Sequence, residues 1–305
     1  MLQRRNSAND AIVVNIDGRL VPRAEAGVSP FDSSVQNGDA VWEGLRLYDG
    51  RIFRLERHLS RLRRSAEMLR YEGYPDDALL VRELGRTLIA NDMHDGVHVR
   101  LTVSRGLKYT SGLDPRVNLG RCSFFILAEH KPPVFDNVGG IRLIVSRQRR
   151  PAADVLDQHI HSCNQLTSIL AKLEANAAGA DDAILLDAAG MLAETSSTHV
   201  FLVRGGGIAT STTRACPEGI TRAVVLEICA ALGIEASVRD VPAAEFAAAD
   251  EMFVTGTMGE ITPVAAVDAH RFAAVPGPVT ARIMARFRQV SRDPAEGTVP
   301  ESERA

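Results

Sequence analysis

Lysine and cysteine are both scarce in this chain of 305 residues. Of the 35 basic residues only three are lysines: Lys108, Lys131 and Lys172. The four cysteines show no paired or C-x-x-C spacing, which favours a reduced, cytoplasmic protein over a disulfide-stapled one. No apolar run approaches the roughly 18 residues of a membrane-spanning helix. The start, MLQRRNSAND, lacks the apolar core of a secretory signal, so none is expected.

An excess of charge of one sign is also missing. The formal net charge is −3, which gives no electrostatic reason to expect binding to nucleic acid or to an anionic membrane. Hydrophobic residues make up 45% and charged residues 24%, as in ordinary globular proteins. The length and composition therefore predict about two folded domains.

The first half of the chain alternates hairpin and helix patterns. Two Asp-Gly pairs between apolar runs are typical of tight hairpin turns, and the apolar residues change to helical spacing after Leu55. We therefore expect a small α+β domain over residues 1–129, with mostly antiparallel strands. Its expected strands lie within residues 11–21, 45–55, 97–103 and 122–128, and its expected helices begin at residues 55 and 75.

The segment HKPPVFDNVGG, residues 130–140, is rich in Pro and Gly and predicts a linker. A larger domain is expected over residues 141–290, followed by a disordered polar tail at 291–305. Its first helix is expected from about Ser162. The apolar residues on one face of that helix are Leu166, Ile169, Leu170 and Leu173. Later helices are expected from residue 219 and over 278–290, with strands near 141–146, 183–186, 200–203, 234–238 and 251–254.

Two short segments have the composition of anion-binding turns. In PEGITR, residues 217–222, a Pro and a Gly precede an apolar helix, so free backbone N–H groups at its start could cradle a phosphate. Taken alone, an ordinary helix cap is the more common explanation of this pattern. In TGT, residues 255–257, a short apolar strand runs into a turn of small residues, where backbone can approach a ligand closely.

Several common active-site signatures are absent from the sequence. No P-loop, GxGxxG or GxSxG follows an expected strand, which argues against NTPase, Rossmann and α/β-hydrolase folds. The eight histidines are scattered without HExxH spacing, so no metal site is expected.

From about residue 12 to residue 290 the chain resembles the class IV aminotransferases, the fold-type IV pyridoxal-phosphate enzymes that include branched-chain and D-amino-acid transaminases. The resemblance lies in seven blocks that occur in order along the chain. These blocks are WEGLR (42–46), RIFRLERHLSRL (51–62), HVRLTVSRG (98–106), ILAKLEANAAGADDAILLD (169–187), AETSSTHVF (193–201), GITR (219–222) and ADEMFVTGTMGEITPV (249–264). The resemblance implies the two-domain α+β architecture of that family.

The resemblance also implies a role for each matching position. Glu194 would pair with the pyridine nitrogen of pyridoxal phosphate (PLP) or pyridoxamine phosphate (PMP) and keep it protonated. The cofactor phosphate would be held by Arg54, Gly219, Ile220, Thr221, Gly256 and Thr257. The substrate, an amino acid, keto acid or other anion, would be met by Asn37, Trp42, Arg100, Gln165, Met258 and Gly259. A homodimer is implied, with the pocket at the domain junction.

The residue that defines the family's chemistry does not match. Family members carry their Schiff-base lysine four residues before a tyrosine, and the aligned positions here hold His161 and Gln165. An imidazole cannot form the imine that a primary amine forms, but it can move protons near neutral pH. The family's N-terminal tyrosine is also replaced, by Asn37.

Three functions fit these observations. The chain could hold PLP or PMP without a covalent bond, with His161 as general acid/base. It could be a cofactor-independent hydrolase or lyase that uses the former phosphate site for an anionic substrate. It could also be a non-catalytic binding protein.

Overall fold

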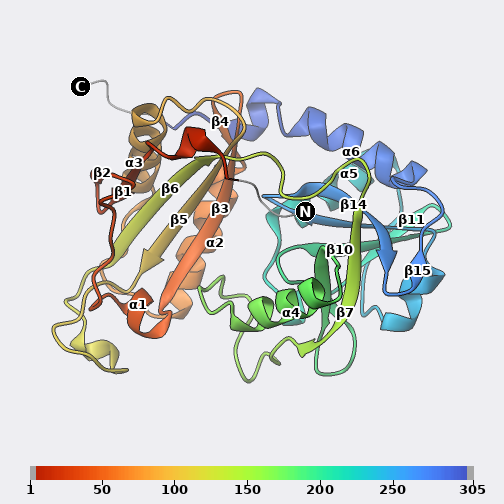
Figure 1. Cartoon of the computed structure of the whole chain (residues 1–305), viewed down its shortest axis with the longest axis horizontal. Helices are drawn as coiled ribbons and strands as arrows, with labels where there is room; N and C mark the ends of the chain where they lie inside the picture. Colours follow the sequence, from red (N-terminus) through yellow and green to blue (C-terminus); the bar gives the residue numbers. More distant parts are fainter. Residues whose placement is uncertain (1–4, 301–305) are drawn as a thin grey trace. The chain divides into compact units, whose positions relative to one another are not determined.

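The computed structural model describes residues 5–300, which fold into two compact units (Figure 1). The N-terminal unit contains residues 5–132, 160–164 and 291–300, and the C-terminal unit contains residues 133–159 and 165–290. This division departs from the expected domain boundaries at two places, because residues 160–164 and 291–300 both belong to the N-terminal unit. The first four and last five residues, which the signal-peptide and tail predictions include, lie outside the described residues.

The N-terminal unit is built on a seven-stranded, fully antiparallel sheet with the order β16-β4-β3-β5-β6-β1-β2. The expected Asp-Gly turns are present, since Asp17 and Asp49 adopt positive φ angles of 51° and 48°. The strands are β1 (Val13–Ile16), β2 (Arg19–Pro22), β3 (Ala40–Tyr48), β4 (Arg51–Phe53), β5 (Val97–Ser104), β6 (Ser123–His130) and β16 (Gly297–Thr298). The predicted antiparallel α+β character of this part of the chain is confirmed.

Helices α2 (Leu55–Met68) and α3 (Asp77–Ala90) pack on this sheet through one shared apolar core (Figure 1). Leu55, Leu59 and Leu62 supply the buried stripe that their spacing predicted on α2. A short helix that was not predicted, α1 (Ser33–Asn37), precedes β3 and ends at Gly38 in a left-handed conformation.

The C-terminal unit is built on a nine-stranded mixed sheet with the order β12-β11-β10-β13-β14-β7-β8-β9, and β15 pairs with β14. Three of its pairings are parallel: β11 with β12, β14 with β7, and β7 with β8. The strands are β7 (Ile141–Arg149), β8 (Asp182–Leu186), β9 (Leu192–Thr195), β10 (His199–Arg204), β11 (Gly207–Thr210), β12 (Ala236–Val238), β13 (Glu251–Gly256), β14 (Glu260–Val267) and β15 (His270–Arg271). The helices are α4 (Leu166–Ala177), α5 (Ile220–Leu232) and α6 (Pro278–Val290).

Helix α4 starts later than predicted, and its buried face is not its most apolar one. It begins at Leu166 rather than near residue 162, because the preceding segment is extended and pairs with β3. Its apolar face is not its buried face, since the core-facing residues are Ser168, Ala171 and Ala175. Small residues allow the helix to lie close against β8, and the four larger residues of the apolar face, Leu166, Ile169, Leu170 and Leu173, are exposed.

The expected disorder of the tail is wrong for residues 291–300. Residues 294–296 form a 3-10 turn, and β16 then pairs with β4 through Gly297 opposite Phe53. Arg292 also donates to Asp49 at 2.7 Å. The segment is held by ion pairs and a short strand ladder rather than by an apolar pattern, so its polar composition gave no sign of order.

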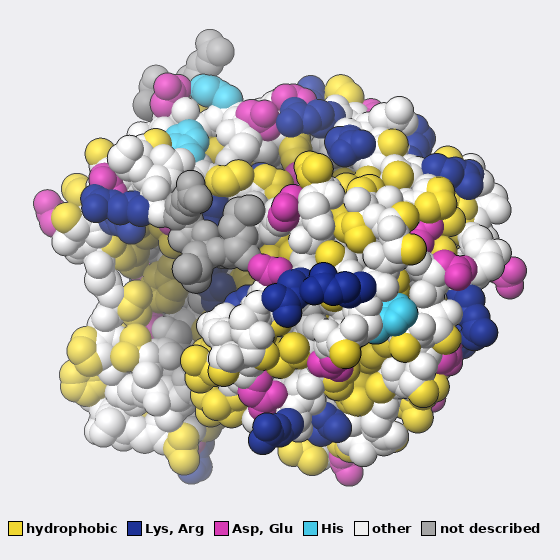
Figure 2. Space-filling view, turned by 45° about the vertical axis from the view of Figure 1, so that its right-hand side comes forward, with side chains coloured by type: hydrophobic (Ala, Val, Ile, Leu, Met, Phe, Trp, Pro, Cys, Tyr) yellow, Lys and Arg dark blue, Asp and Glu magenta, His cyan; other side chains and the backbone are white. Residues whose placement is uncertain are grey.

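Basic and acidic side chains are interspersed on the face shown in Figure 2, with apolar side chains between them. This mixture agrees with the small net charge of the sequence. Among residues 5–300, no helix has both the length and the apolar character needed to cross a bilayer.

Candidate active site

His161 lies in an extended segment that runs beside the start of β3. Trp42 donates its backbone N–H to the carbonyl of His161 at 3.1 Å, and Cys163 donates to the carbonyl of Ala40 at 2.8 Å. The indole Nε1 of Trp42 donates to the carbonyl of Ser162 at 3.1 Å. These bonds fix His161 on the sheet of the N-terminal unit, although its position in the chain is close to α4.

The imidazole of His161 is oriented by Trp42. Its Nδ1 lies 2.5 Å from the backbone carbonyl oxygen of Trp42, and the two rings stack with centroids 4.6 Å apart. A carbonyl oxygen only accepts hydrogen bonds, so Nδ1 must carry the hydrogen. The neutral ring therefore keeps its lone pair on Nε2, the nitrogen that can accept a proton.

A buried carboxylate, Glu43 of β3, lies beneath His161. Arg61 of α2 donates through Nε to Oε1 of Glu43 and through Nη2 to Oε2, both at 2.7 Å. Nδ1 of His58 lies 2.6 Å from Oε2. Nδ1 of His161 lies 3.5 Å from Oε1 of Glu43. Two histidines and a carboxylate would suit a metal, but Arg61 donates to both oxygens of the carboxylate, and no grouping of metal ligands occurs among the described residues. The cluster is an ion-pair network.

Opposing effects set the protonation of this network. Burial favours the neutral form of Glu43, but the charge of Arg61 and hydrogen bonds from His161 and His58 outweigh burial and hold the pKa of Glu43 well below its usual range. Burial, together with the charge of Arg61, lowers the pKa of His161, and Glu43 only partly opposes this. His161 is therefore neutral at pH 7.

Arg100 of β5 completes this cluster. Its guanidinium lies 4.0 Å from the centroid of the Trp42 ring, and its Nη2 lies 3.6 Å from the sulfur of Cys163. The structure thus brings together three residues that the sequence singled out, His161, Trp42 and Arg100.

Sequence reasoning missed Glu43, His58 and Arg61 as members of this cluster. A signal was present for His58. His58 lies on the same stripe as Leu55, Leu59 and Leu62, where a polar side chain needs a buried partner.

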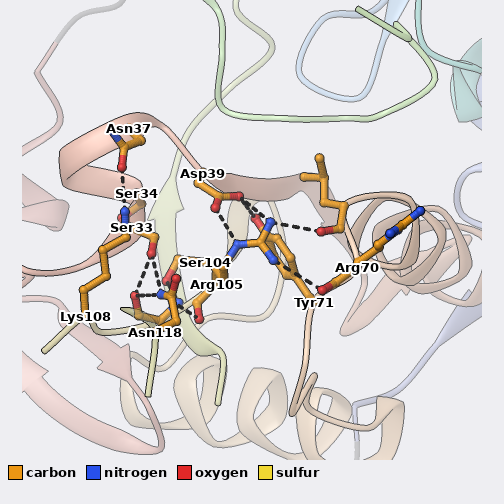
Figure 3. A network of polar contacts seen from close by, with 12 residues as sticks. Ser33, Ser34, Asn37, Asp39, Arg70, Tyr71, Ser104, Arg105, Lys108 and Asn118 are labelled. Carbon is orange, nitrogen blue, oxygen red and sulfur yellow. Dashed lines mark hydrogen bonds and ion pairs between the residues drawn. The ribbon is translucent and has the colours of Figure 1, made fainter. Parts of the chain in front are cut away.

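Asn37 lies at the end of α1, where its side chain is engaged by a lysine. Lys108 is buried and donates through Nζ to the side chain of Asn37 at 2.6 Å (Figure 3). The same Nζ donates to the carbonyl of Gly112 at 2.6 Å. Nearby, Asp39 accepts from Arg105 at 2.6 Å and from the hydroxyl of Tyr71 at 2.9 Å. These bonds fix the end of β5 against α1.

The other two lysines also have partners of their own. Lys172 of α4 donates to the carbonyl of Asp181, and Lys131 lies 3.8 Å from the carboxylate of Glu129.

Arg54 stands between β4 and α2 in a left-handed conformation with φ of 52°. Its guanidinium forms an ion pair with Glu296 and lies 5.7 Å from the centroid of the Phe53 ring. A non-glycine residue with this backbone is uncommon and persists where its surroundings hold it.

In the C-terminal unit, Glu194 of β9 is buried and paired with Arg150 at 2.8 Å. The same nitrogen of Arg150 donates to the hydroxyl of Ser168 at 2.9 Å. The guanidinium gives this buried carboxylate a fixed position and a counter-charge, which suit it to accept a hydrogen bond from a cationic ring.

The start of α5 and the end of β13 lie side by side in the same unit. A Cβ on Gly219 would come within 2.3 Å of the His199 ring, and His199 of β10 pairs with Thr255 of β13. No side chain caps α5 at Gly219, so the first amides of this 13-residue helix, with the buried Thr221 hydroxyl, are suited to an anion. The hydroxyl of Thr255 is buried without a hydrogen-bond partner among the described residues. This region fits a phosphate.

The turn between β13 and β14 is fixed from one side. The carbonyl of Met258 accepts from the amide of Val134 at 3.1 Å, and that of Gly259 accepts from Asn137 at 3.1 Å. Gly256 fits closely here, since a Cβ would lie 3.0 Å from the methyl of Thr198. Gln165 stands directly before α4, where its backbone carbonyl accepts from the amide of Ile169 at 2.9 Å.

Comparison with known proteins bears on this geometry. Residues 40–267 match the family described as amino-transferase class IV. The chain belongs to the class IV aminotransferases. It is 43% identical over 284 residues to the branched-chain-amino-acid aminotransferase-like protein 2 of Arabidopsis thaliana, in an alignment that covers 93% of this chain and 51% of that protein. The chain thus spans about half the length of the first curated relatives it matches.

Solved aminotransferases share the whole fold. The T.th. branched-chain amino acid aminotransferase complexed with N-(5'-phosphopyridoxyl)-L-glutamate superposes with a TM-score of 0.88 at 31% identity, covering 95% of this chain and 99% of that one. The same enzyme with pyridoxamine 5'-phosphate gives a TM-score of 0.87 at 31% identity, with the same coverage. The predicted fold-type IV class is confirmed.

Proposed function

We propose that this chain binds PLP or PMP without a covalent bond and uses His161 as a general acid/base on an amino acid or keto acid. The observation that carries the proposal is the hydrogen bond from Nδ1 of His161 to the carbonyl of Trp42, which leaves Nε2 as the basic nitrogen. A histidine at this position can take and return a proton, although it cannot anchor the cofactor.

The proposed cofactor-binding residues follow from the donor sets described above. The amides at the start of α5, with Thr221 and Thr257, would hold the phosphate together with Arg54. Gly219 and Gly256 would let the backbone of this region pack closely against His199 and Thr198. Glu194, already paired with Arg150, would accept from the ring nitrogen. The bound cofactor would supply a protonated ring that accepts electrons from the substrate carbon.

The residues around His161 define what this histidine does. It is neutral before the reaction, so Nε2 can accept a proton directly. The positive charge then develops on a ring whose Nδ1 lies 3.5 Å from the ionised Glu43 and whose hydrogen bond to Trp42 persists. Arg61 opposes this charge, so the proton is returned readily.

Arg100 is proposed to recognise the substrate carboxylate. It is the cation packed on Trp42, beside His161. Asn37, Gln165 and the turn at Met258 and Gly259 are proposed as further substrate contacts. The T.th. enzyme has also been solved with 4-methylvaleric acid, a branched carboxylic acid, which supports a carboxylate of this class as ligand.

A homodimer is part of the proposal. The exposed apolar face of α4 runs along one side of the helix at a spacing of three and four residues, and water is a poor environment for such a stripe. A second copy of the chain would cover it.

The experiment that tests the function is proton exchange in heavy water. With PLP added, the wild-type protein should exchange the α-hydrogen of a branched-chain amino acid, and His161→Gln should lose this by about a hundredfold or more while binding PLP normally. Equal exchange by both proteins would exclude His161 as the base. Absence of PLP binding by the wild type would favour the cofactor-independent hydrolase or lyase, or a binding protein without catalysis.

A further inference from the structure

The C-terminal segment 292–298, here called the strap, crosses the end of β4 where Arg54 begins α2. The backbone N–H of Arg54 donates to the carbonyl of Glu296 at 3.0 Å, and Gly297 then pairs with Phe53. Gly297 permits this close approach, because a Cβ there would lie 2.8 Å from the Cβ of Arg51. The strap is thus attached to the backbone of Arg54 and of the strand that precedes it.

The strap also places a carboxylate on the Arg54 side chain. Glu296 forms an ion pair with Nη1 of Arg54, and both side chains are largely shielded, with exposed fractions of 27% and 18%. Other side chains of the strap have other partners: Arg292 contacts Asp49 and Asp95, and Thr298 donates to Glu56. Glu296 is the strap residue paired with the guanidinium.

We propose that Glu296 is a positioning residue that holds the guanidinium of Arg54 ready for a phosphate group. The inference rests on the proposed role of Arg54 as a phosphate ligand. Because the backbone of Glu296 is bonded to Arg54 and the next residue, Gly297, pairs with Phe53, a ligand cannot simply displace Glu296. It acts as a fixed brace, and the planar guanidinium, which carries five N–H donors, can serve a brace and a phosphate together.

If Glu296 positions Arg54 for a phosphate, its loss should weaken the binding of ligands that carry a phosphate and of no others. Glu296→Ala should weaken PLP binding about tenfold, because a braced guanidinium loses less freedom when it binds. Binding of pyridoxal, which lacks the phosphate, should not change. Glu296→Gln keeps an acceptor but loses the charge, so its effect should lie between those of the wild type and Glu296→Ala. Glu56→Gln removes a nearby carboxylate that bonds to Thr298, and it should change PLP affinity less than twofold.

The test is a double-mutant cycle by calorimetry with PLP and pyridoxal, using wild type, Glu296→Ala, Arg54→Ala and the double variant. In the Arg54→Ala background, loss of Glu296 should have no further effect. Equal or tighter PLP binding by Glu296→Ala would overturn the inference, as would additive losses in the cycle or an equal loss for pyridoxal. If Glu296→Ala does not fold, Glu296→Gln decides in the same way.

Failure of the proposed function looks different. If the wild type does not bind PLP, or if Arg54→Ala binds it as the wild type does, then the role of Arg54 is wrong and the brace has no function to serve. If Arg54→Ala loses affinity and Glu296→Ala does not, only the brace is wrong.

Discussion

Nδ1 of His161 lies 2.5 Å from the backbone carbonyl oxygen of Trp42, a residue 119 positions earlier in the chain. This one contact fixes which nitrogen carries the hydrogen and which can act as a base. It also ties a segment that precedes α4 to the sheet of the N-terminal unit.

The first prediction concerns the protonation of His161. Its pKa in the folded protein lies below the ordinary value of 6.5, because of burial and the charge of Arg61. The unfolded chain therefore binds this proton more readily, so the stability linked to His161 is complete above about pH 6.5 and is lost as the pH falls further. Long-range nitrogen–proton NMR should show a neutral ring with hydrogen on Nδ1 at pH 7. Hydrogen on Nε2, or a charged ring, would disprove the assignment.

The second prediction concerns Glu43. Glu43→Gln removes the carboxylate to which Arg61 donates two hydrogen bonds, and it leaves a buried cation without its counter-charge. We expect a loss of about 3–5 kcal/mol in the free energy of unfolding, measured with urea. Asp77→Asn is the matched control, since it breaks the more exposed pair with Arg63 of the same helix and should cost about 1 kcal/mol or less. Similar losses in both variants would show that the buried network stabilises the fold no more than the exposed ion pair does.

The third prediction concerns Thr257. Thr257→Ala should weaken PLP binding by roughly tenfold to a hundredfold, because hydrogen bonds to a charged group are worth about 1.5–3 kcal/mol. Pyridoxal should bind equally to both proteins, since it has no phosphate. Calorimetry with the two ligands makes the comparison, and unchanged PLP affinity would remove Thr257 from the phosphate site.

The fourth prediction concerns assembly. Sedimentation should show a dimer for the wild-type protein, and Leu173→Glu should shift it toward the monomer, because a charge on the exposed face of α4 cannot be buried cheaply. Glu174→Gln, one position away, should leave the dimer intact. A wild-type monomer at micromolar concentration would contradict the proposal.

The sequence predicted the elements whose signals are local. The Asp-Gly turns and the apolar stripe of α2 lie where their patterns placed them. The periodicity of α4 was real, but it marked the exposed face, since the residues that meet the sheet are small. Apolar periodicity shows that one face of a helix is more apolar than the other. It does not show which of the two faces will pack against the sheet.

The candidate site could be predicted only in part, because its contacts join distant residues. Arg100 and His161 were singled out by family resemblance, and Trp42 with them. The contact of His161 with Glu43, and that of Glu43 with Arg61, depend on strand pairing and on the packing of α2, which no local pattern encodes. The ordered strap was missed for the same reason, because two backbone pairs and a few ion pairs hold it.

The most direct test of non-covalent cofactor binding is the intact mass of the PLP-loaded protein after borohydride reduction. The account predicts that the wild-type protein holds PLP in equilibrium dialysis and yet shows no added mass after reduction. His161→Lys with Gln165→Tyr serves as the positive control, since an amine at 161 should become labelled with a pyridoxyl group. A pyridoxyl label on Lys108, Lys131 or Lys172 of the wild type would contradict the account.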